Sequence, residues 1–154
     1  MKGCRKNGGP KLFLAGLLLA AAGILIPKWC GLKAMAVVSG SMEPKIPVGS
    51  MVYVKPVSAA GLRPGDVCTY RLQTEPTLVT HRVVQVDGVH QTLLTKGDAN
   101  DRPDPVVNFE QVVGQVKFHL PGAGWWVLGL RTPLGMLFLC LGTIWAVRKL
   151  IYIV

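Results

Sequence analysis

The sequence predicts a mostly β protein, in which a small antiparallel β-domain is flanked by one N-terminal and one C-terminal transmembrane helix. Three observations lead to this fold class. Of the 154 residues 50% are hydrophobic, one uncharged apolar run lies near each end, and the segment between the runs is rich in β-branched residues and turn residues. The expected order is tail, helix, β-domain, helix and tail, at residues 1–11, 12–28, 29–124, 133–148 and 149–154.

The first apolar run covers residues 12–26 and contains no charged side chain. As a helix it is roughly 22 Å long, which is short of the roughly 30 Å hydrocarbon core of a bilayer. It can still span a membrane if Lys11 and Lys28 extend their charges to the headgroups and Trp29 lies at the interface. A cleaved signal peptide ending at residues 34–36 is an alternative, but that site lies well beyond the apolar run.

The second apolar run is expected to form a helix that begins near Pro133. Thr132-Pro133 resembles a helix N-cap followed by proline at the first helical position. Residues 134–147 are uncharged, and two basic residues follow them. Trp125-Trp126 precede the run and are typical of a membrane interface.

The distribution of charge predicts the orientation of the chain. The formal net charge is +9, but all eight carboxylates lie within residues 39–110, together with only seven basic residues. The basic excess therefore belongs to the two ends. By the positive-inside rule, both termini are expected in the cytoplasm and the β-domain on the extracytoplasmic face of the cell membrane. Nucleic-acid binding is not expected, because basic and aromatic residues do not alternate.

The middle of the chain contains five stretches with the composition of β-strands, separated by turn residues. Asp87-Gly88 between two of them is typical of a hairpin turn. The four cysteines form no C-x-x-C motif, so neither a metal site nor a disulfide framework is expected. The expected strands are Met51–Val54, Asp66–Leu72, Leu78–Asp87, Gln91–Thr95 and Val112–Leu120.

A serine-rich turn, residues 39–44, follows the first apolar run closely. A serine hydroxyl becomes a useful nucleophile only beside a base, and that base needs a third group to orient it. His81 is the natural base for Ser41, since imidazole titrates near neutrality. Lys96 is a competing base if burial lowers its pKa, although its Gly-Asp neighbours indicate a loop. The orienting carboxylate is expected from the acidic stretch that holds Asp98, Asp101 and Asp104.

Four motifs, in this order, resemble the boxes of type I signal peptidases. They are Ser39-Gly40-Ser41-Met42-Glu43-Pro44, Arg63-Pro64-Gly65-Asp66, His81-Arg82-Val83-Val84 and Thr95-Lys96-Gly97-Asp98. With both apolar ends and Val113-Gly114, the resemblance covers nearly the whole chain. The family has a form with a lysine base and a form with a histidine base. Because His81 stands in the place of the lysine, the chain is similar to the histidine form of the endoplasmic reticulum complex, archaea and some Gram-positive bacteria.

The resemblance implies a role for each serine of the turn. Ser41, directly before the methionine, is the expected nucleophile. The hydroxyl of Ser39 is expected to help the backbone N–H of Ser41 bind the oxyanion. Met42 is either a packing residue or an apolar contact for the bilayer or the substrate.

The resemblance also assigns the acidic residues. The spacing after Gly-Asp places the acid that orients His81 at Asp104, and Asp98 matches a second required acidic position. Asp101 is the reserve, because Asp101 and Asp104 exchange roles if the register of the loop differs.

The implied function is that of signal peptidase I, a membrane-bound serine endopeptidase that cleaves signal peptides from exported preproteins without a metal or a cofactor. The substrate is expected to add a strand beside residues 36–38. Its partners are then exported preproteins and membrane lipid, while a need for partner subunits stays open. One alternative is a non-catalytic membrane-tethered β-domain that binds or assembles exported proteins. Another is a self-cleaving regulator of the repressor type, which the two anchors and the histidine argue against.

Overall fold

The computed structural model describes residues 8–73 and 77–151. Its contacts divide the chain into two compact units. Residues 27–126 form the larger unit, which holds every candidate site residue. The described residues of segments 1–26 and 127–154 form the smaller unit, which is helical.

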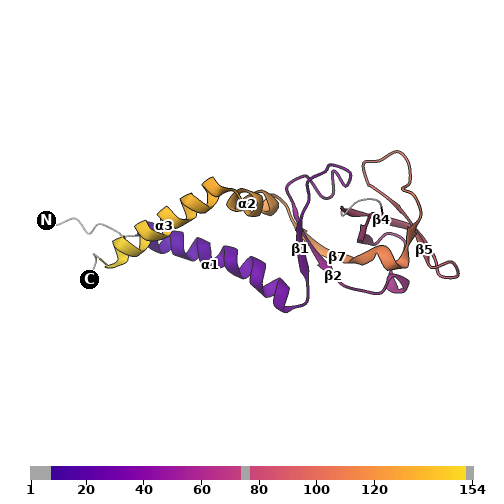
Figure 1. The fold of residues 1–154 in the computed structure, drawn as a ribbon, viewed down its shortest axis with the longest axis horizontal. Coiled ribbons are helices and arrows are strands. Elements are labelled where there is room, and N and C mark those ends of the chain that lie inside the picture. Colours follow the sequence, from indigo (N-terminus) through magenta and orange to yellow (C-terminus); the bar gives the residue numbers. More distant parts are fainter. Residues whose placement is uncertain (1–7, 74–76, 152–154) are drawn as a thin grey trace. The chain divides into compact units, whose positions relative to one another are not determined.

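The larger unit is built on a sheet in which the described residues supply seven strands and every neighbouring pair is antiparallel. The order across the sheet is β1-β2-β7-β3-β4-β5-β6. Figure 1 labels β1, β2, β4, β5 and β7 of this sheet. The mostly β fold predicted from the sequence is therefore confirmed, and so are its five strands. The strands are β1 (Lys33–Ala36), β2 (Met51–Lys55), β3 (Val67–Arg71), β4 (Leu78–Asp87), β5 (Thr92–Lys96), β6 (Val107–Asn108) and β7 (Val112–Leu120), with the 3₁₀ turns η1 (Ala59–Gly61) and η2 (Phe109–Gln111).

The last of the described strands in the sequence, β7, lies inside the sheet as the third strand from one edge. It pairs with β2 on one side and with β3 on the other, and the register shifts in both ladders. At Gly114 the end of β2 lies so close that a Cβ atom would collide with the carbonyl group of Lys55. Only glycine fits at this crossing, so Gly114 allows β7 to lie between its two partners.

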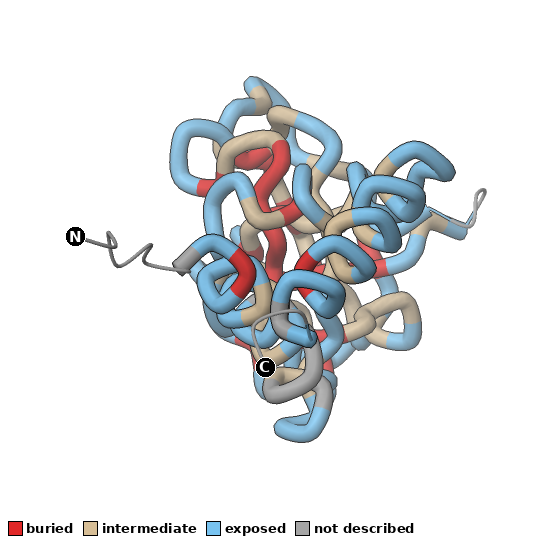
Figure 2. The backbone as a smooth tube through the Cα atoms, turned by 90° about the vertical axis from the view of Figure 1, so that its left-hand side faces the viewer, coloured by how far each residue is buried: buried red, intermediate tan, exposed pale blue. Residues whose placement is uncertain are grey.

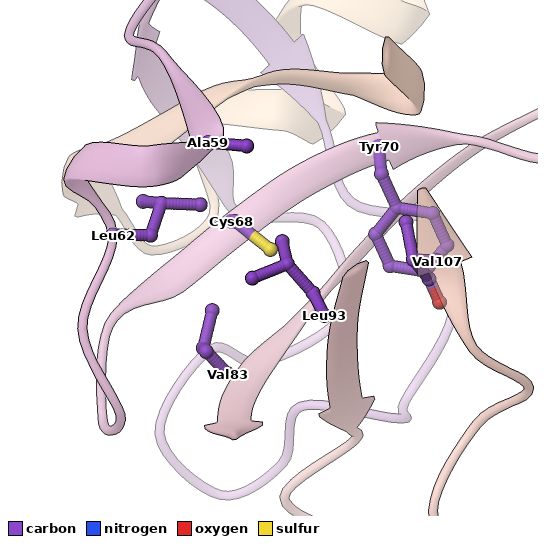
Figure 3. Packing of buried hydrophobic residues seen from close by; sticks show 7 residues of the cluster. All are labelled: Ala59, Leu62, Cys68, Tyr70, Val83, Leu93 and Val107. Carbon is purple, nitrogen blue, oxygen red and sulfur yellow. The ribbon is translucent and has the colours of Figure 1, made fainter. Parts of the chain in front are cut away.

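Two apolar clusters stabilise the larger unit, and Figure 2 shows the buried segments in red among exposed loops. In the first cluster, η1 and the strands β3 to β6 direct side chains toward one another (Figure 3). In the second, β2 packs against the serine-rich turn. Burial of this apolar area is the main favourable contribution to folding. The first cluster consists of Ala59, Leu62, Cys68, Tyr70, Val83, Leu93 and Val107, and the second of Met42, Ile46, Val52 and Val54.

The hairpin turn predicted at Asp87-Gly88 joins β4 to β5. One carboxylate oxygen of Asp87 accepts the backbone N–H groups of Val89 and His90, each at 3.0 Å. The other lies 2.7 Å from Nδ1 of His90. These hydrogen bonds lower the pKa of Asp87. The contacts of His90 with Asp87 place its side chain in the exposed turn, where it helps to hold the hairpin.

The helices are α1 (Gly8–Trp29), α2 (Ala123–Leu130) and α3 (Pro133–Ile151). As predicted, α3 begins at Pro133, with the Thr132 hydroxyl accepting the N–H of Gly135 at 3.1 Å. α2 is not expected from the sequence. Among the described helices, none alone has the length and apolarity to cross a bilayer, whereas α2 and α3, bent by 90°, meet these two criteria as a pair. The flanking transmembrane helices therefore stay a prediction.

Candidate active site

The serine-rich turn connects β1 to β2 and is fixed by its own backbone and by Met42. The N–H of Glu43 donates to the carbonyl of Gly40 at 3.0 Å, and the N–H of Ile46 donates to that of Met42 at 2.9 Å. The side chain of Met42 is 1% exposed and packs in the second apolar cluster. Of the two interpretations open for Met42, the structure supports packing.

Ser39 and Ser41 flank Gly40, and their two hydroxyl groups face each other. The Oγ atoms of Ser39 and Ser41 lie 3.3 Å apart, within hydrogen-bond distance. Ser41 is half-buried and Ser39 is exposed. The turn therefore presents two hydroxyl groups side by side on a backbone that the buried Met42 holds in place.

His81 lies on β4, opposite Cys68 of β3, and its ring is buried. Its Nδ1 atom is 2.6 Å from Oδ2 of Asp104. A carboxylate can only accept, so we assign the proton of this bond to Nδ1. In the neutral ring Nε2 then carries a free lone pair, which is the form that a general base requires.

Asp104 is itself held by two further side chains. Its Oδ2 accepts hydrogen bonds from the hydroxyls of Thr95, at 2.8 Å, and Tyr70, at 3.2 Å. Its backbone N–H donates to the carbonyl of Thr95 at 2.8 Å. Burial raises the pKa of Tyr70 to about 12, which keeps its hydroxyl protonated and able to donate. The carboxylate that faces His81 is thus fixed at both its backbone and its side chain.

Asp98 makes a different set of contacts. Its Oδ1 and Oδ2 accept from Nε and Nη2 of Arg82 at 2.7 and 2.6 Å, and no hydrogen bond joins it to His81 in the described structure. Arg82 also donates to the carbonyl of Gly65 at 2.6 Å. The hydrogen bonds from Arg82 lower the pKa of Asp98, and Lys45 and His81 add smaller electrostatic contributions in the same direction. Asp98 therefore ties its loop to β4.

The other two candidates from the acidic stretch lie apart from the imidazole. Asp101 is exposed, and its side chain forms no hydrogen bond or ion pair with the residues that the structure describes. Lys96 follows Thr95 on β5, and successive side chains of a strand point to opposite faces. Because Thr95 faces Asp104, Lys96 is directed to the other face of the sheet.

The loop after β5 also contacts the serine-rich turn. The N–H of Ala99 donates to the carbonyl of Ser41 at 2.9 Å, and a Cβ atom on Gly97 would lie 2.6 Å from the same oxygen. Gly97 directly follows Lys96, which pairs with Arg82 beside His81. This contact brings the backbone of Ser41 to the end of β4 that carries His81.

No hydrogen bond joins the Ser41 hydroxyl to the His81 ring in the structure described here. The hydroxyl of Ser41 has Ser39 as its partner, and the ring of His81 has Asp104. Hydrogen bonds between a nucleophile and its base are often long without substrate and shorten when substrate binds. The structure joins His81 directly to Asp104, and it joins Ser41 through its backbone to the loop that carries Asp104.

Sequence reasoning missed Tyr70 and Thr95 as parts of this site. Their positions were the available signal. Thr95 is the first residue of the fourth motif, and Tyr70 lies two residues after the buried Cys68, on the same face of β3. Metal binding has no comparable cluster, since no three His, Cys, Asp or Glu side chains within residues 8–73 and 77–151 are arranged to hold an ion.

No family model matches this chain, but comparison with known proteins finds relatives that are signal peptidases. Signal peptidase I W of Bacillus subtilis is 40% identical over 100 residues, which is 62% of this chain and 52% of that protein. The signal peptidase complex catalytic subunit SEC11 of Komagataella phaffii is 33% identical over 111 residues, 59% of this chain and 62% of that protein. The chain is related to type I signal peptidases. The resemblance of its motifs to that family is thus confirmed.

The human relative extends the match along the chain. Signal peptidase complex catalytic subunit SEC11C of Homo sapiens is 25% identical over 124 residues, or 73% of this chain and 65% of that protein. This chain therefore spans between about half and two thirds of the length of these signal peptidases.

The ion pair between Asp98 and Arg82 is expected to make the stability of this chain depend on pH, with a loss of stability at acidic pH. The folded-state pKa of Asp98 is lowered from an ordinary value of 3.8, so its contribution is complete above that pH and is lost as the pH falls through the lower folded value. Asp98→Asn should therefore lower the urea midpoint of the full chain in detergent at pH 7. The difference from wild type should shrink as the pH is lowered from 7 toward 2.

Asp101→Asn is the matched control for this measurement, because the exposed Asp101 lies in the same loop without an ion pair. It should leave the midpoint unchanged at both pH values. A difference between Asp98→Asn and wild type that stays constant from pH 7 down to pH 2 would contradict the assigned role of the ion pair.

Proposed function

We propose that this protein is a membrane-bound serine endopeptidase that removes N-terminal signal peptides from exported preproteins. The single observation that carries the proposal is the 2.6 Å contact between His81 and Asp104, in a chain whose relatives are signal peptidases. Ser41 is the nucleophile, His81 the general base and Asp104 the acid that orients the base. Asp98 acts at a distance from the reacting atoms, by holding the loop through Arg82.

The hydrogen-bond pattern supports a two-step reaction. As Oγ of Ser41 bonds to the scissile carbonyl carbon, Nε2 of His81 takes the hydroxyl proton. The tetrahedral intermediate then expels the amine of the mature protein, which receives that proton from His81. Water, deprotonated by the same imidazole, hydrolyses the acyl-enzyme and releases the carboxylate of the signal peptide. Asp104 holds the tautomer that both steps require.

The oxyanion of the intermediate needs donors that are already in place. We assign this role to the backbone N–H of Ser41 and the hydroxyl of Ser39, because the Ser39 Oγ lies 3.3 Å from the nucleophile. Removing one donor of this kind typically costs about 3 kcal/mol of transition-state stabilisation. The carbonyl of Ser41 is already engaged by Ala99, which limits rotation of the peptide that follows Ser41.

An open sheet edge leads to the nucleophile and supports binding of the substrate as an added strand. β1 is the outermost strand on its side of the described sheet. The N–H of Val37 donates to Ser50, and its carbonyl accepts from Gly49, each at 2.8 Å. Since backbone groups alternate in direction along a strand, those of residues 36 and 38 point to the open edge. An extended substrate paired there runs beside the chain that leads to Ser41.

The location at a membrane rests on the sequence. The apolar runs at both ends, with basic residues outside them, support two anchors, cytoplasmic termini and an extracytoplasmic catalytic unit. Lipid and exported preproteins are then the partners.

The direct test uses the full chain in detergent micelles and a purified preprotein with small residues before its cleavage site. We expect one cut, located by sequencing the new N-terminus, and we expect that bulky residues at that position prevent it. Capture of the preprotein without a cut would instead support the non-catalytic binding domain, for which the lack of a hydrogen bond between Ser41 and His81 is the favourable observation.

A further inference from the structure

The turn that joins the serine segment to β2 also contacts the first turn of α2. Gly49 accepts a hydrogen bond from the backbone N–H of Gly124 at 2.8 Å. The same Gly49 donates to Val37, and the next residue, Ser50, accepts from Val37. One short turn, residues 49–50, therefore bridges α2 and the chain just ahead of the nucleophile. All these residues belong to the larger unit.

Two glycines make this contact possible. Gly49 has a φ of 81°, and a Cβ atom there would collide with the indole of Trp125. A Cβ atom on Gly124 would lie 2.7 Å from the carbonyl oxygen of Ser50 and 2.8 Å from that of Gly49. The indole thus lies against the bare backbone of the turn, and both glycines are buried. Larger residues at either position would force α2 away.

The turn has a second constraint of its own. The hydroxyl of Ser50 is fully buried and donates to the carbonyl of Pro47 at 2.6 Å. With Ser50 held in this way and Gly49 covered by Trp125, the hydrogen bonds to Val37 are protected from competition by water on two sides.

We propose that Trp125 is a positioning residue for substrate, which acts by holding the turn at residues 49–50 against Val37 and thereby fixing the edge beside residues 36–38. This inference rests on the proposed function, because that edge is where we expect the preprotein strand to pair. Loss of the indole should allow the edge to become disordered, so that binding must order it again. The triad does not touch Trp125 and should keep its chemistry.

The test compares three variants of the full chain in detergent. Trp125→Ala should raise KM for the preprotein roughly tenfold, which is about 1.4 kcal/mol, and leave kcat within about threefold. Trp125→Phe, which keeps an aromatic ring over Gly49, should recover most of the wild-type KM. Trp126→Ala is the matched control, since the Cβ position of Gly49 meets the indole of Trp125, which is 58% exposed, whereas the neighbouring Trp126 is 78% exposed and should have no effect on KM.

A second readout separates the positioning role from the chemistry. A small fluorophosphonate labels an activated serine without pairing to the sheet, so its rate of reaction with Ser41 should be equal in wild type and Trp125→Ala. If Trp125→Ala does not fold, Gly124→Ala replaces it, because its methyl group displaces α2 from the same turn and should raise KM in the same way. A wild-type KM in the folded variant, or equal losses of kcat and labelling, would overturn the inference.

The outcomes also distinguish this inference from the function on which it rests. Wild-type protein that neither cleaves the preprotein nor reacts with the probe would contradict the proposed function. Wild-type protein that does both, together with an unchanged KM in Trp125→Ala and Gly124→Ala, would contradict the role of Trp125 alone.

Discussion

Ser41→Ala is expected to lower kcat/KM for preprotein cleavage by on the order of 10³- to 10⁶-fold, because the proposed acyl-enzyme forms on the hydroxyl that this change removes. Met42 is buried and Ser41 is only half-buried, so removing the hydroxyl oxygen should leave the turn intact. Cleavage is measured on gels with full-length protein in detergent, and the urea midpoint should match wild type. The fluorophosphonate should no longer label the chain.

Two other serines calibrate this result. Ser39→Ala should cost roughly 10²- to 10³-fold, as expected for one oxyanion donor, while labelling is slowed rather than abolished. Ser58→Ala is the control, since Ser58 is exposed and its side chain caps nothing in η1. Cleavage by Ser41→Ala at the wild-type rate would refute the assigned nucleophile, and a larger loss in Ser39→Ala than in Ser41→Ala, with labelling abolished in Ser39→Ala, would reverse the two roles.

Asp104→Asn is expected to lower kcat by roughly 10²- to 10⁴-fold with little change in KM. An amide can turn its NH₂ group toward Nδ1 of His81, and the ring proton then moves to Nε2, where it blocks the base. The 2.6 Å contact in the wild-type chain leaves no room for a bridging water molecule. The measurement is steady-state kinetics across pH 6 to 9 with the same preprotein.

Asp101→Asn is the control for this prediction as well. It lies three residues earlier on the same loop, is exposed, and should change kcat by less than about threefold, as is usual for a surface polar group without partners. A larger loss in Asp101→Asn than in Asp104→Asn would show that the loop changes its register when substrate binds, and would exchange the roles of the two residues.

The sequence could predict the elements whose residues carry a strong local signal. Strands β2, β3, β4, β5 and β7 are rich in β-branched residues, and Thr132-Pro133 marks the start of α3 by its capping chemistry. β1 and β6, of four and two residues, are too short for alternation to be visible. α2 was missed because its eight residues are apolar on all sides and contain two glycines, which gives no helical periodicity.

The residues of the candidate site also fall into those with a local sequence signal and those without one. Local motifs singled out Ser41, His81 and the acidic stretch, but the choice between Asp101 and Asp104 depends on where the loop returns to the sheet. The backbone hydrogen bond from Asp104 to Thr95 fixes the point where the loop returns to the sheet. It joins two residues that no local sequence pattern relates. Tyr70 lies on β3, two places from β5 in the sheet, and it contacts Asp104 in the loop that follows β5. Its contribution could therefore be seen only in three dimensions.

The position of β7 between β2 and β3 has a consequence for the order of events during synthesis. Translation delivers residues 39–104, and with them every member of the site, before residues 112–120 leave the ribosome. Within the described sheet, β7 alone pairs the strand that follows Ser41 with the strand next to that of His81. In the nascent chain, Ser41 and His81 therefore lie on separate groups of paired strands until β7 emerges. On the proposed function, competence to cut is acquired only after β7 has paired with both strands.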